Sequence, residues 1–525
     1  MTVESETRFD ADVLVVGGGP AGAWAALTAK HAGAESVLLV DKGYCGTSGA
    51  TASANTGVWV VSGEERERAI GQRLAQGGGL ARREVMEAVL DTTAMQLASL
   101  EGFGFTFPVD DEGLPYRKNL RGPDYMAFMR RLLRRAGVRI LDHSPAQELL
   151  MSDGEVAGAA GHRLHEDEPY RVYARSVVLA SGGVAFLSKT LGCDVNTGDG
   201  LLMAAEVGAS LSGMEFSAQY GICPAYSSVT KGLPYFWATF SDESGRVLES
   251  TGDRMLTVAR GLLDGKVFAV LDKAPPEVQR WLRAGQPNCF LPHDRLGIDP
   301  FTQRFPVTLR CEGTVRGTGG IHLRDDACRT DVRGLFAAGD AASREALVGS
   351  ATGGGAPNAA WAISSGSWAG RAAAEHARAR GPLRDARIVR PAGGVGLRPL
   401  EAAREVSVPG LIEAARGELL PIEKNMFRTG AQLERSLALL DDAFGEARAH
   451  LAATGRARVR AREAAALLAC GRYAYRSALA RGESRGLHRR LDRPALDPAQ
   501  TRSLRCTGVD TVAVHPAPQE ARGAP

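Results

Sequence analysis

The residues best suited to chemistry lie in a glycine-rich segment near the start of the chain. Gly17, Gly19 and Gly22 form a GxGxxG pattern directly after an apolar run, and an alanine-rich helix pattern follows. The first glycine allows a tight turn, the second lets the backbone approach a pyrophosphate, and the third lets helix and strand pack closely. Asp41 ends the next apolar strand, where its carboxylate can accept hydrogen bonds from a ribose. The segment therefore predicts a βαβ unit that binds a dinucleotide at the N-terminus of the helix.

A second signature, far downstream, distinguishes FAD from NAD. Residues 330–340 read TDVRGLFAAGD, and the buried strand that they predict ends on Gly339 and Asp340. A carboxylate at this position suits the ribityl hydroxyls of a flavin, which a nicotinamide dehydrogenase does not contain. The glycine-rich stretch at 349–355 then leads into a small-residue helix at 361–374, whose N-terminus we expect to face the isoalloxazine. The two signatures, in this order, predict FAD.

Composition narrows the class of protein further. The 525 residues are too many for one core and predict several domains. A net charge of +3 on so large a surface favours no nucleic-acid partner, and no run approaches the roughly 18 apolar residues of a membrane span. The eight cysteines show no CxxC or zinc spacing, so we expect no metal ligation by this chain. The polar start contains no recognisable signal peptide, and we expect a reduced, cytoplasmic protein.

Periodicity predicts the elements that position these motifs. We expect helices at 64–101, 125–136, 201–207 and 361–374, and a helical bundle within 401–481. We expect strands at 13–16, 36–40, 138–141, 148–151, 156–162, 172–174, 176–179 and 509–514. The strand at 176–179 runs into paired glycines, and we expect it to return to the nucleotide-binding sheet.

Seven motifs, in order, carry a resemblance to a known family. They are GGGPAG at 17–22, the loop at 47–57, VVLASGG at 177–183, TGDG at 197–200 followed by MEF at 214–216, GTGGI at 317–321, GLFAAGD at 334–340, and ESRGLH at 483–488. Together they resemble the fumarate reductase and succinate dehydrogenase flavoprotein family. Its relatives include L-aspartate oxidase, the 3-ketosteroid dehydrogenases and the adenylylsulfate reductase flavoprotein subunit. The resemblance covers nearly the whole chain.

The resemblance implies an α/β fold. A Rossmann-like FAD-binding domain would be interrupted by an α+β capping domain and followed by a C-terminal helical domain. We place the first part of the FAD-binding domain at 1–215, the capping domain at 216–315, the second part of the FAD-binding domain at 316–380, and the helical domain and tail at 381–525. Residues 380–399, rich in Gly, Pro and Arg, are a plausible linker.

The motifs and the resemblance together give a set of expected FAD contacts. These are Gly17, Gly19, Pro20, Ala21, Gly22, Asp41, Lys42, Thr47, Ser48, Gly49, Ala180, Gly182, Asp199, Gly339, Asp340 and Asn358. Some members of the family attach FAD covalently to a histidine in the loop after the second strand. This loop, at 46–57, contains no histidine, so we expect noncovalent FAD.

The expected substrate site departs from the family pattern. Members that process dicarboxylates have a histidine after Glu-Phe, a His-Tyr-Thr before Gly-Gly-Ile, and an arginine in a Gly-Ala-Asn-Arg segment, and this chain lacks all three. Their acid–arginine relay falls here on Lys231 and Pro234. Two carboxylates require fixed Arg and His donors, and losing those donors would leave buried charge unpaired. We therefore expect a substrate other than a simple dicarboxylate.

Three residues remain as catalytic candidates. Arg254 lies near the place of an Arg-Asp pair whose arginine shuttles a proton in the family, although the order is reversed here. Tyr220 could act as an acid or base on a neutral substrate. Arg316 could bind one anionic group, as could Arg260 or Arg310. For each arginine a structural or surface role is the alternative, and for Tyr220 the alternative is a place in the core of the capping domain.

Three functions fit these residues. The first, which we favour, is an FAD-dependent oxidoreductase (a dehydrogenase or reductase) that transfers a hydride between flavin N5 and a small organic substrate bound between the FAD and capping domains. The second is an electron-transfer subunit similar to the adenylylsulfate reductase flavoprotein, which would need an iron–sulfur or ferredoxin partner because this chain lacks cluster ligands. The third is a flavin-binding scaffold with a degenerate site.

Overall fold

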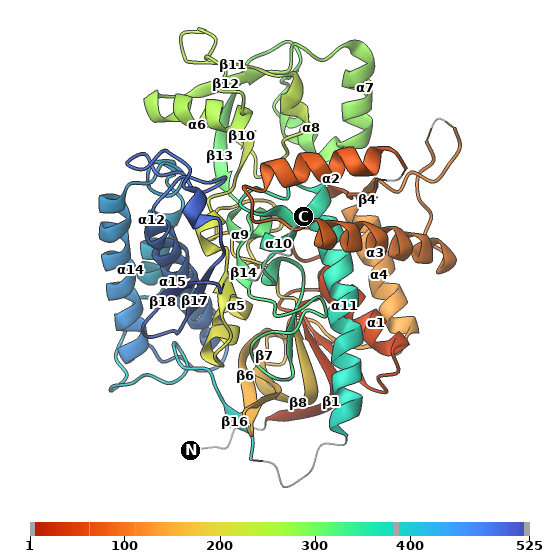
Figure 1. Cartoon of the computed structure of the whole chain (residues 1–525), viewed down its shortest axis with the longest axis vertical. Helices are drawn as coiled ribbons and strands as arrows, with labels where there is room; N and C mark the ends of the chain where they lie inside the picture. The colour runs from red at the N-terminus through yellow and green to blue at the C-terminus, as the bar shows by residue number, and fades with distance from the viewer. Residues whose placement is uncertain (1–5, 62, 111, 382–387, 519–525) are drawn as a thin grey trace.

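The chain is described here from a computed structural model, which covers residues 6–61, 63–110, 112–381 and 388–518. At its centre is a mixed sheet (Figure 1). In order across the sheet its strands are β16 (Arg390–Pro391), β6 (Ala146–Ser152), β7 (Glu155–Arg163), β8 (Glu168–Leu179), β1 (Thr7–Val16), β2 (Val37–Val40) and β5 (Arg139–Leu141), with β15 (Leu335–Ala337) paired to β8. The strands β5, β2, β1, β8 and β15 run parallel, so their carboxyl ends meet at one edge.

Strand β8 joins two strands that the sequence predicts separately, 172–174 and 176–179. Its side chains alternate between buried and partly exposed in the first half and are all buried in the last four residues. The change of pattern reflects a change of neighbour along one edge of the strand, since β8 pairs with β7 in its first half and with β15 at its end, while β1 lies along the other edge. The predicted return of this segment to the nucleotide-binding sheet is confirmed.

The helices of the FAD-binding domain are α1 (Pro20–His31), α2 (Glu65–Gln76), α3 (Arg83–Gly102), α4 (Gly122–Arg135), α5 (Asp199–Glu206), α9 (Gly313–Arg316), α10 (Glu345–Val348) and α11 (Ala356–Arg380). Of these, α1, α5 and α11 pack on the sheet. The predicted helix at 64–101 is two helices, because Gly78 and Gly79 adopt positive φ and break it. A short two-stranded antiparallel sheet of β3 (Asn55–Gly57) and β4 (Asn119–Arg121) lies beside them.

Helix α11 packs unusually closely on α1, and small residues allow it. A Cβ atom on Gly366 would lie 2.3 Å from the carbonyl oxygen of Ala21, and one on Gly370 would lie 2.1 Å from that of Ala25. The helix also begins earlier than predicted, at Ala356, with a proline in its first turn. Both helices therefore present their N-termini at the same edge of the sheet (Figure 1).

The capping domain forms one end of the molecule (Figure 1). Its sheet runs in the order β10 (Tyr220–Pro224), β13 (Phe305–Cys311), β12 (Val267–Val270) and β11 (Thr239–Ser241). A 3-10 turn, η2 (Pro234–Trp237), and the helices α6 (Arg254–Asp264), α7 (Pro276–Gly285) and α8 (Pro287–Arg295) complete it. A separate hydrophobic cluster, whose buried members all lie between Ile222 and Val307, fills its interior. The cap therefore has a core of its own.

The C-terminal part is a helical domain that packs beside the FAD-binding domain. It contains α12 (Val408–Leu419), α13 (Ile422–Asn425), α14 (Gly430–His450) and α15 (Ala457–Ala480). A small sheet of β14 (Gly320–Ile321), β9 (Leu211–Ser212), β17 (Leu504–Thr507) and β18 (Ala513–Pro516) joins the two domains. The strand predicted at 509–514 therefore lies slightly later in the chain.

Buried ion pairs fix the helical domain in place. Arg462 on α15 pairs with Glu206 on α5 at 2.6 Å, and Arg481 pairs with Glu215 at 2.7 Å. Glu215 belongs to the 3-10 turn η1 (Met214–Phe216). The ESRGLH segment extends this network, because Glu483 accepts from both Arg481 and Arg485. These charges are out of water, so each depends on its partner.

The predicted fold class is confirmed: the chain has a Rossmann-like FAD-binding fold with an inserted α+β cap and a C-terminal helical domain. The exact boundaries stay predictions, although the cap's core lies within 216–315. Part of the predicted linker at 380–399 lies outside the described residues. Among the helices described, none combines the length and the apolar character that crossing a membrane requires.

Candidate flavin and substrate site

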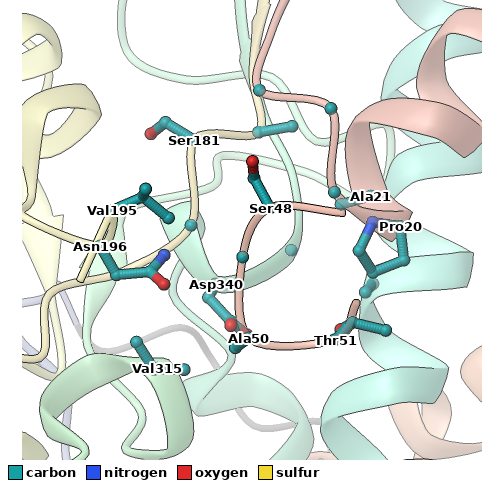
Figure 2. Close-up of a pocket in the computed structure, with 18 of the residues that line it drawn as sticks. Pro20, Ala21, Ser48, Ala50, Thr51, Ser181, Val195, Asn196, Val315 and Asp340 are labelled. Carbon is teal, nitrogen blue, oxygen red and sulfur yellow. The ribbon is translucent and has the colours of Figure 1, made fainter. Parts of the chain in front are cut away.

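A large pocket opens at the edge where the parallel strands end. It holds about 1310 Å³ of space, part of it open to solvent, and we call it the flavin pocket. Figure 2 shows Ser181 and Asn196 on one side of it and Pro20, Ala21 and Thr51 on the other. Of the predicted FAD contacts the structure brings these to its wall: Gly17, Gly19, Pro20, Ala21, Asp41, Lys42, Ser48, Gly49, Ala180, Gly182, Asp199, Gly339, Asp340 and Asn358.

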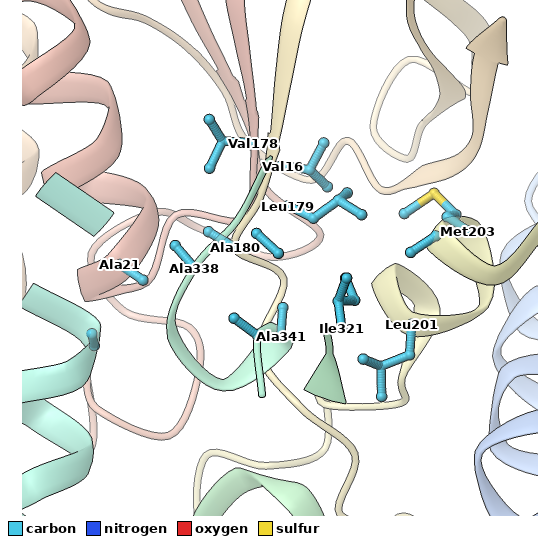
Figure 3. Close-up of a cluster of buried hydrophobic side chains, with 14 of the residues drawn as sticks. Val16, Ala21, Val178, Leu179, Ala180, Leu201, Met203, Ile321, Ala338 and Ala341 are labelled. Atoms are coloured by element: carbon cyan, nitrogen blue, oxygen red, sulfur yellow. The ribbon is translucent and has the colours of Figure 1, made fainter. Parts of the chain in front are cut away.

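Behind this wall lies an apolar layer (Figure 3). Val16, Leu179 and Ala180 come from the ends of the central strands, and Met203 and Leu201 come from α5. All five are buried. The loops that carry the polar wall are therefore anchored on a packed core, which keeps their geometry fixed.

Two predicted contacts lie outside the wall. A Cβ on Gly22 would lie 1.8 Å from the carbonyl oxygen of Gly17, so Gly22 serves the packing of helix on strand. The hydroxyl of Thr47 donates to the carbonyl oxygen of Tyr44 at 3.5 Å, which turns it away from the pocket. Gly17 has φ +106°, in agreement with its predicted role in a tight turn.

The loop that opens α1 exposes backbone to the pocket. Gly19 is the N-cap residue of α1, and no heavy atom lies within 4 Å of the place where its Cβ would be. Gly49, Gly354 and Gly355 are open in the same way and also line the pocket. Together they form a cradle of main chain at two helix N-termini, which suits a pyrophosphate and a planar ring.

Asp41 holds this loop in shape. Its two carboxylate oxygens accept hydrogen bonds from the main-chain N–H groups of Gly18, at 2.6 Å, and Gly43, at 2.8 Å. Burial raises the pKa of Asp41, and the two N–H groups act against this by favouring the charged form. Each oxygen keeps a lone pair for a ribose hydroxyl.

Lys42 and Asp199 form a partly buried ion pair in the pocket wall. The Lys42 ammonium lies 2.7 Å from the carboxylate of Asp199 and 2.7 Å from that of Glu463 on α15. It also donates to the hydroxyl of Thr197 at 2.6 Å. Burial alone would lower the pKa of Lys42, but the two carboxylates outweigh burial and raise it. Lys42 is therefore a fixed cation with its charge already balanced.

The guanidinium of Arg344 is fully buried and donates a hydrogen bond to the carboxylate of Asp340, which holds that carboxylate in place. Burial raises the pKa of Asp340, while the charge of Arg344 works in the opposite direction. Arg344 also donates to the carbonyl oxygens of Thr314, Val315 and Gly317, at 2.5, 3.0 and 2.7 Å. Arg344 is not among the residues that the sequence predicts for the site, because nothing in its local sequence marks it.

Three buried polar atoms test whether a flavin nucleotide fits here. Ser181 Oγ, Asn196 Oδ1 and Asn358 Oδ1 line the pocket and have no hydrogen-bond partner within the described chain. Buried polar atoms are normally paired, so these three indicate a polar ligand. Together with the main-chain cradle and the carboxylate of Asp340, they fit FAD. Ser181 and Asn196 adjoin predicted contacts in the ASGG and NTGDG segments but are not themselves among the predicted residues.

The cap closes the pocket at its far end. Lys231, from the loop between β10 and η2, donates from its ammonium to the carbonyl oxygen of Asn55 at 2.8 Å. Asn288 donates to the carbonyl oxygen of Ser53 at 3.0 Å, and the Asn55 amide donates to that of Gly285. The cap therefore contacts the segment 53–55 of the FAD-binding domain at three polar points.

A side chamber lies beside the flavin pocket, on the side of the cap, with about 400 Å³ of space, part of it open to solvent. Its polar wall consists of Ser53, Thr190, Cys193, Thr230, Asn288 and Glu312, and it shares Ala50, Ala54, Lys231, Val315 and Arg316 with the flavin pocket. Arg316, one of the predicted catalytic residues, thus stands at the boundary with Lys231. Its guanidinium lies 3.3 Å from the carboxylate of Glu312.

The structure does not bring Tyr220 to either space. Tyr220 is fully buried, and its hydroxyl donates toward the carbonyl oxygens of Leu420, at 3.0 Å, and Leu419, at 3.3 Å. Burial raises its pKa well above the ordinary value. The side chain turns into the helical domain because β10 runs along the border between the cap and that domain. Tyr220 therefore cannot act as an acid or a base on a substrate in the flavin pocket or the side chamber.

Arg254 is also outside both spaces. It lies exposed at the start of α6, with its guanidinium 3.4 Å from the centre of the Phe236 ring. Arg260 is exposed on the same helix, and Arg310 donates to the carbonyl oxygens of Ser188 and Ser227. Of the four arginines considered from the sequence, Arg316 is the one that lines the flavin pocket.

Comparison with known families decides what kind of protein this is. Residues 12–357 match the family described as FAD binding domain, and residues 417–512 match the fumarate reductase flavoprotein C-terminal family. The chain belongs to the fumarate reductase and succinate dehydrogenase flavoproteins. It is an FAD-dependent oxidoreductase.

Relatives of this flavoprotein include enzymes of more than one kind. It is 29% identical over 546 residues to L-aspartate oxidase of Mycobacterium leprae, a match that covers 94% of this chain and 95% of the relative. It is 26% identical over 371 residues to L-aspartate oxidase of Streptomyces coelicolor, covering 63% of each chain. It is 25% identical over 382 residues to one chain of the fumarate reductase (CoM/CoB) of Methanothermobacter marburgensis, covering 64% of this chain and 68% of the relative.

Solved structures agree on the fold. A mutated FrdA of E. coli quinol fumarate reductase superposes with a TM-score of 0.82 at 20% identity, covering 99% of this flavoprotein and 98% of that chain. Adenylylsulfate reductase from Archaeoglobus fulgidus superposes with a TM-score of 0.75 at 18% identity, covering 99% and 97%. At these identities the likeness concerns the fold alone.

Proposed function

We propose that this flavoprotein is an oxidoreductase for a small organic substrate that carries a single anionic group, and that it is not an enzyme for simple dicarboxylates. One observation carries the proposal. Among the described residues that line the flavin pocket, Lys231 and Arg316 are the cations that are not already bound to two carboxylates. No histidine is found among those lining residues.

Different residues of the chain bind the cofactor and the substrate. The main-chain cradle, Asp41 and Asp340 hold the FAD, which we expect to be noncovalent because the loop at 46–57 lacks a histidine. When bound, FAD supplies the two-electron chemistry of accepting or donating a hydride. Arg316 pairs with the anionic group of the substrate, and its own contact with Glu312 fixes the direction of its guanidinium. The cap excludes water from the reacting atoms.

A second carboxylate on the substrate would lack a partner of comparable strength. Recognition of a dicarboxylate requires several fixed Arg or His donors. In this pocket the cations that are not already bound to two carboxylates are one guanidinium and one amine. An unpaired charge in such a site costs roughly several kcal/mol. An uncharged substrate would leave the partly buried guanidinium of Arg316 without an anionic ligand. A single anionic group is therefore the best match.

A graded series of probes tests the proposal. The photoreduced protein is mixed anaerobically with fumarate, monomethyl fumarate or dimethyl fumarate, which carry two, one and no carboxylates. The rate of flavin reoxidation is divided by the rate for free reduced FAD, because the esters differ in intrinsic reactivity. We expect the largest ratio for the monoester. A larger ratio for fumarate, or no reaction with any of the three, would contradict the proposal.

A variant pair locates the anion partner. Arg316→Gln removes the guanidinium at the pocket, and we expect it to lower the monoester ratio at least about tenfold. Arg260→Gln, on the exposed face of α6, is the control and should leave the ratio unchanged. If the two changes altered the monoester ratio equally, Arg316 would not be the residue that binds the anionic group. The iron–sulfur partner considered from the sequence stays a prediction, and no specific contact surface favours it.

A further inference from the structure

We propose that Lys231 is the proton-transferring residue of this site. Its amine stands at the boundary between the flavin pocket and the side chamber, where it gives a proton to the substrate carbon next to the one that gains the hydride, and takes that proton back in the reverse direction. The inference rests on the proposed function. It concerns a residue of the cap, placed beside the cofactor pocket by tertiary contact.

The hydrogen bonding of Lys231 leaves its amine available. It donates to the carbonyl oxygen of Asn55 at 2.8 Å, and no carboxylate of the described chain lies within ion-pair distance of it. Lys42, the other lysine of the flavin pocket, is held by Asp199 and Glu463. An ammonium with three donors and one neutral partner can point a second N–H bond into the pocket.

The surroundings of Lys231 favour release of its proton. Burial is the largest influence, the charge of Arg316 on α9 acts in the same direction, and together they lower the pKa of Lys231 to about 8. Glu312 and the thiol of Cys289 on α8 oppose this weakly. A group that titrates near the working pH can both donate and accept a proton in a transition state.

Other titratable groups of the two spaces are less suited. Asp41 is bound to two main-chain N–H groups, Asp199 to Lys42, and Asp340 to Arg344. Burial raises the pKa of Cys193 to about 12, which keeps its thiol protonated. Glu312 lines the side chamber but not the flavin pocket, and one of its oxygens already accepts from Thr230. Of the lysines, carboxylates and thiols that line the two spaces in the described chain, Lys231 is the one that lines both.

The proposed step balances in atoms and electrons. In the reductive direction an activated C=C bond loses its π bond, gains a hydride at one carbon and gains the proton of Lys231 at the neighbouring carbon. The N–H bond of Lys231 breaks and leaves a neutral amine, which takes a proton from solvent through the side chamber. The substrate is reduced by two electrons, and the FAD of the oxidoreductase supplies them.

Variants separate proton transfer from electron transfer. Lys231→Met removes the donor, and we expect flavin reoxidation by monomethyl fumarate to slow about 100-fold or more. Reoxidation by ferricyanide needs no proton on carbon and should stay within about threefold of the unmodified protein. Lys273→Met is the control, because Lys273 is a lysine of the cap that also donates to a main-chain carbonyl oxygen, that of Ala238, but lines neither space.

The pH dependence provides a second readout. In the unmodified protein the rate with monomethyl fumarate should fall about tenfold per pH unit above pH 8, because the reaction needs the ammonium form. Lys231→Met should lack this slope. If Lys231→Met keeps both the rate and the slope, the inference is overturned.

A measurement without substrate keeps the inference distinct from the proposed function. Trace acetylation of the FAD-loaded protein between pH 6 and 10, read by peptide mass spectrometry, gives the titration of each lysine. We expect half-maximal labelling of Lys231 near pH 8, well below the ordinary lysine value. Half-maximal labelling of Lys231 at the ordinary lysine value of about 10.4 would overturn the inference. Failure of every alkene probe, with Lys231 still titrating near pH 8, would instead count against the proposed function.

Discussion

The buried guanidinium of Arg344 holds the carboxylate of Asp340 and also donates to carbonyl oxygens on both sides of Arg316, those of Thr314, Val315 and Gly317. One side chain thus joins the cofactor wall of the pocket to the wall that carries the anion partner. Arg344 touches neither space itself. It is a positioning residue for both.

Replacing Arg344 with methionine should therefore disturb both walls together. The change leaves a buried carboxylate and several carbonyl oxygens without their donor, and we expect a loss of about 3–5 kcal/mol in the free energy of unfolding. We also expect the protein to purify with less FAD. Denaturant unfolding and the flavin absorbance per protein measure the two effects. Arg246→Met, which breaks an exposed pair with Asp242, is the control and should cost at most about 1 kcal/mol.

Glu345 should make stability depend on pH. Burial, followed by the charge of Glu215, raises the pKa of Glu345 from 4.5 to about 7. Between these values the folded state keeps a proton that the unfolded state loses, so the free energy of unfolding should fall as the pH rises through this window. Glu345→Gln mimics the protonated form and should become the more stable protein above pH 7, by on the order of 3 kcal/mol.

Denaturant unfolding from pH 4.5 to 8 measures the effect of Glu345. The two proteins should have similar stabilities at the acid end of the range and diverge toward the alkaline end. Glu84→Gln, at an exposed position on α3, should follow the unmodified protein throughout. Parallel curves for Glu345→Gln and the unmodified protein would mean that Glu345 is charged in the fold.

Two glycines of the first turn should respond differently to a side chain. Gly19→Val directs its methyl groups into the open pocket, and we expect a folded protein whose FAD dissociation constant is at least about tenfold higher. Gly22→Val meets the carbonyl oxygen of Gly17 and should prevent correct packing of α1 on β1. Circular dichroism and FAD titration distinguish the two. Normal FAD affinity in a folded Gly19→Val protein would rule out this loop as the pyrophosphate cradle.

The contact between Asn288 and Ser53 should help to keep the cap closed. Asn288→Ala removes one hydrogen bond between the domains, worth about 1 kcal/mol. We expect iodide to quench flavin fluorescence several times more effectively in this variant. Gln279→Ala loses a similar bond that lies inside the cap, to the carbonyl oxygen of Ala274, and serves as the control. Equal quenching in the two variants would mean that the hydrogen bond between Asn288 and Ser53 does not help to keep the cap closed.

The FAD half of the site could be predicted because its signals are local. A positive φ at Gly17, an open approach at Gly19 and a carboxylate at Asp340 each follow from a few neighbouring residues. The location of the site can be predicted without knowing the order of the strands, since parallel strands present their carboxyl ends at one edge of the sheet.

The substrate half could not be predicted in the same way. Tyr220 and Arg254 carry suitable groups, but the packing of the cap turns one into the helical domain and the other to solvent. Lys231 reaches the pocket only because its loop meets Asn55, which lies 176 residues earlier in the chain. Side-chain direction across such a distance depends on how the domains dock, and periodicity does not contain that information.

The cap's separate core has a consequence for how new specificities can arise. Its buried side chains all lie between Ile222 and Val307, while the strands and loops that hold FAD pack in the main core. Residues of the cap's own core can therefore be exchanged without repacking the cofactor half. A grafted or recombined cap segment is the route by which we expect a change of substrate, with Arg316 retained in the FAD-binding half, where Arg344 holds the carbonyl groups on both sides of it.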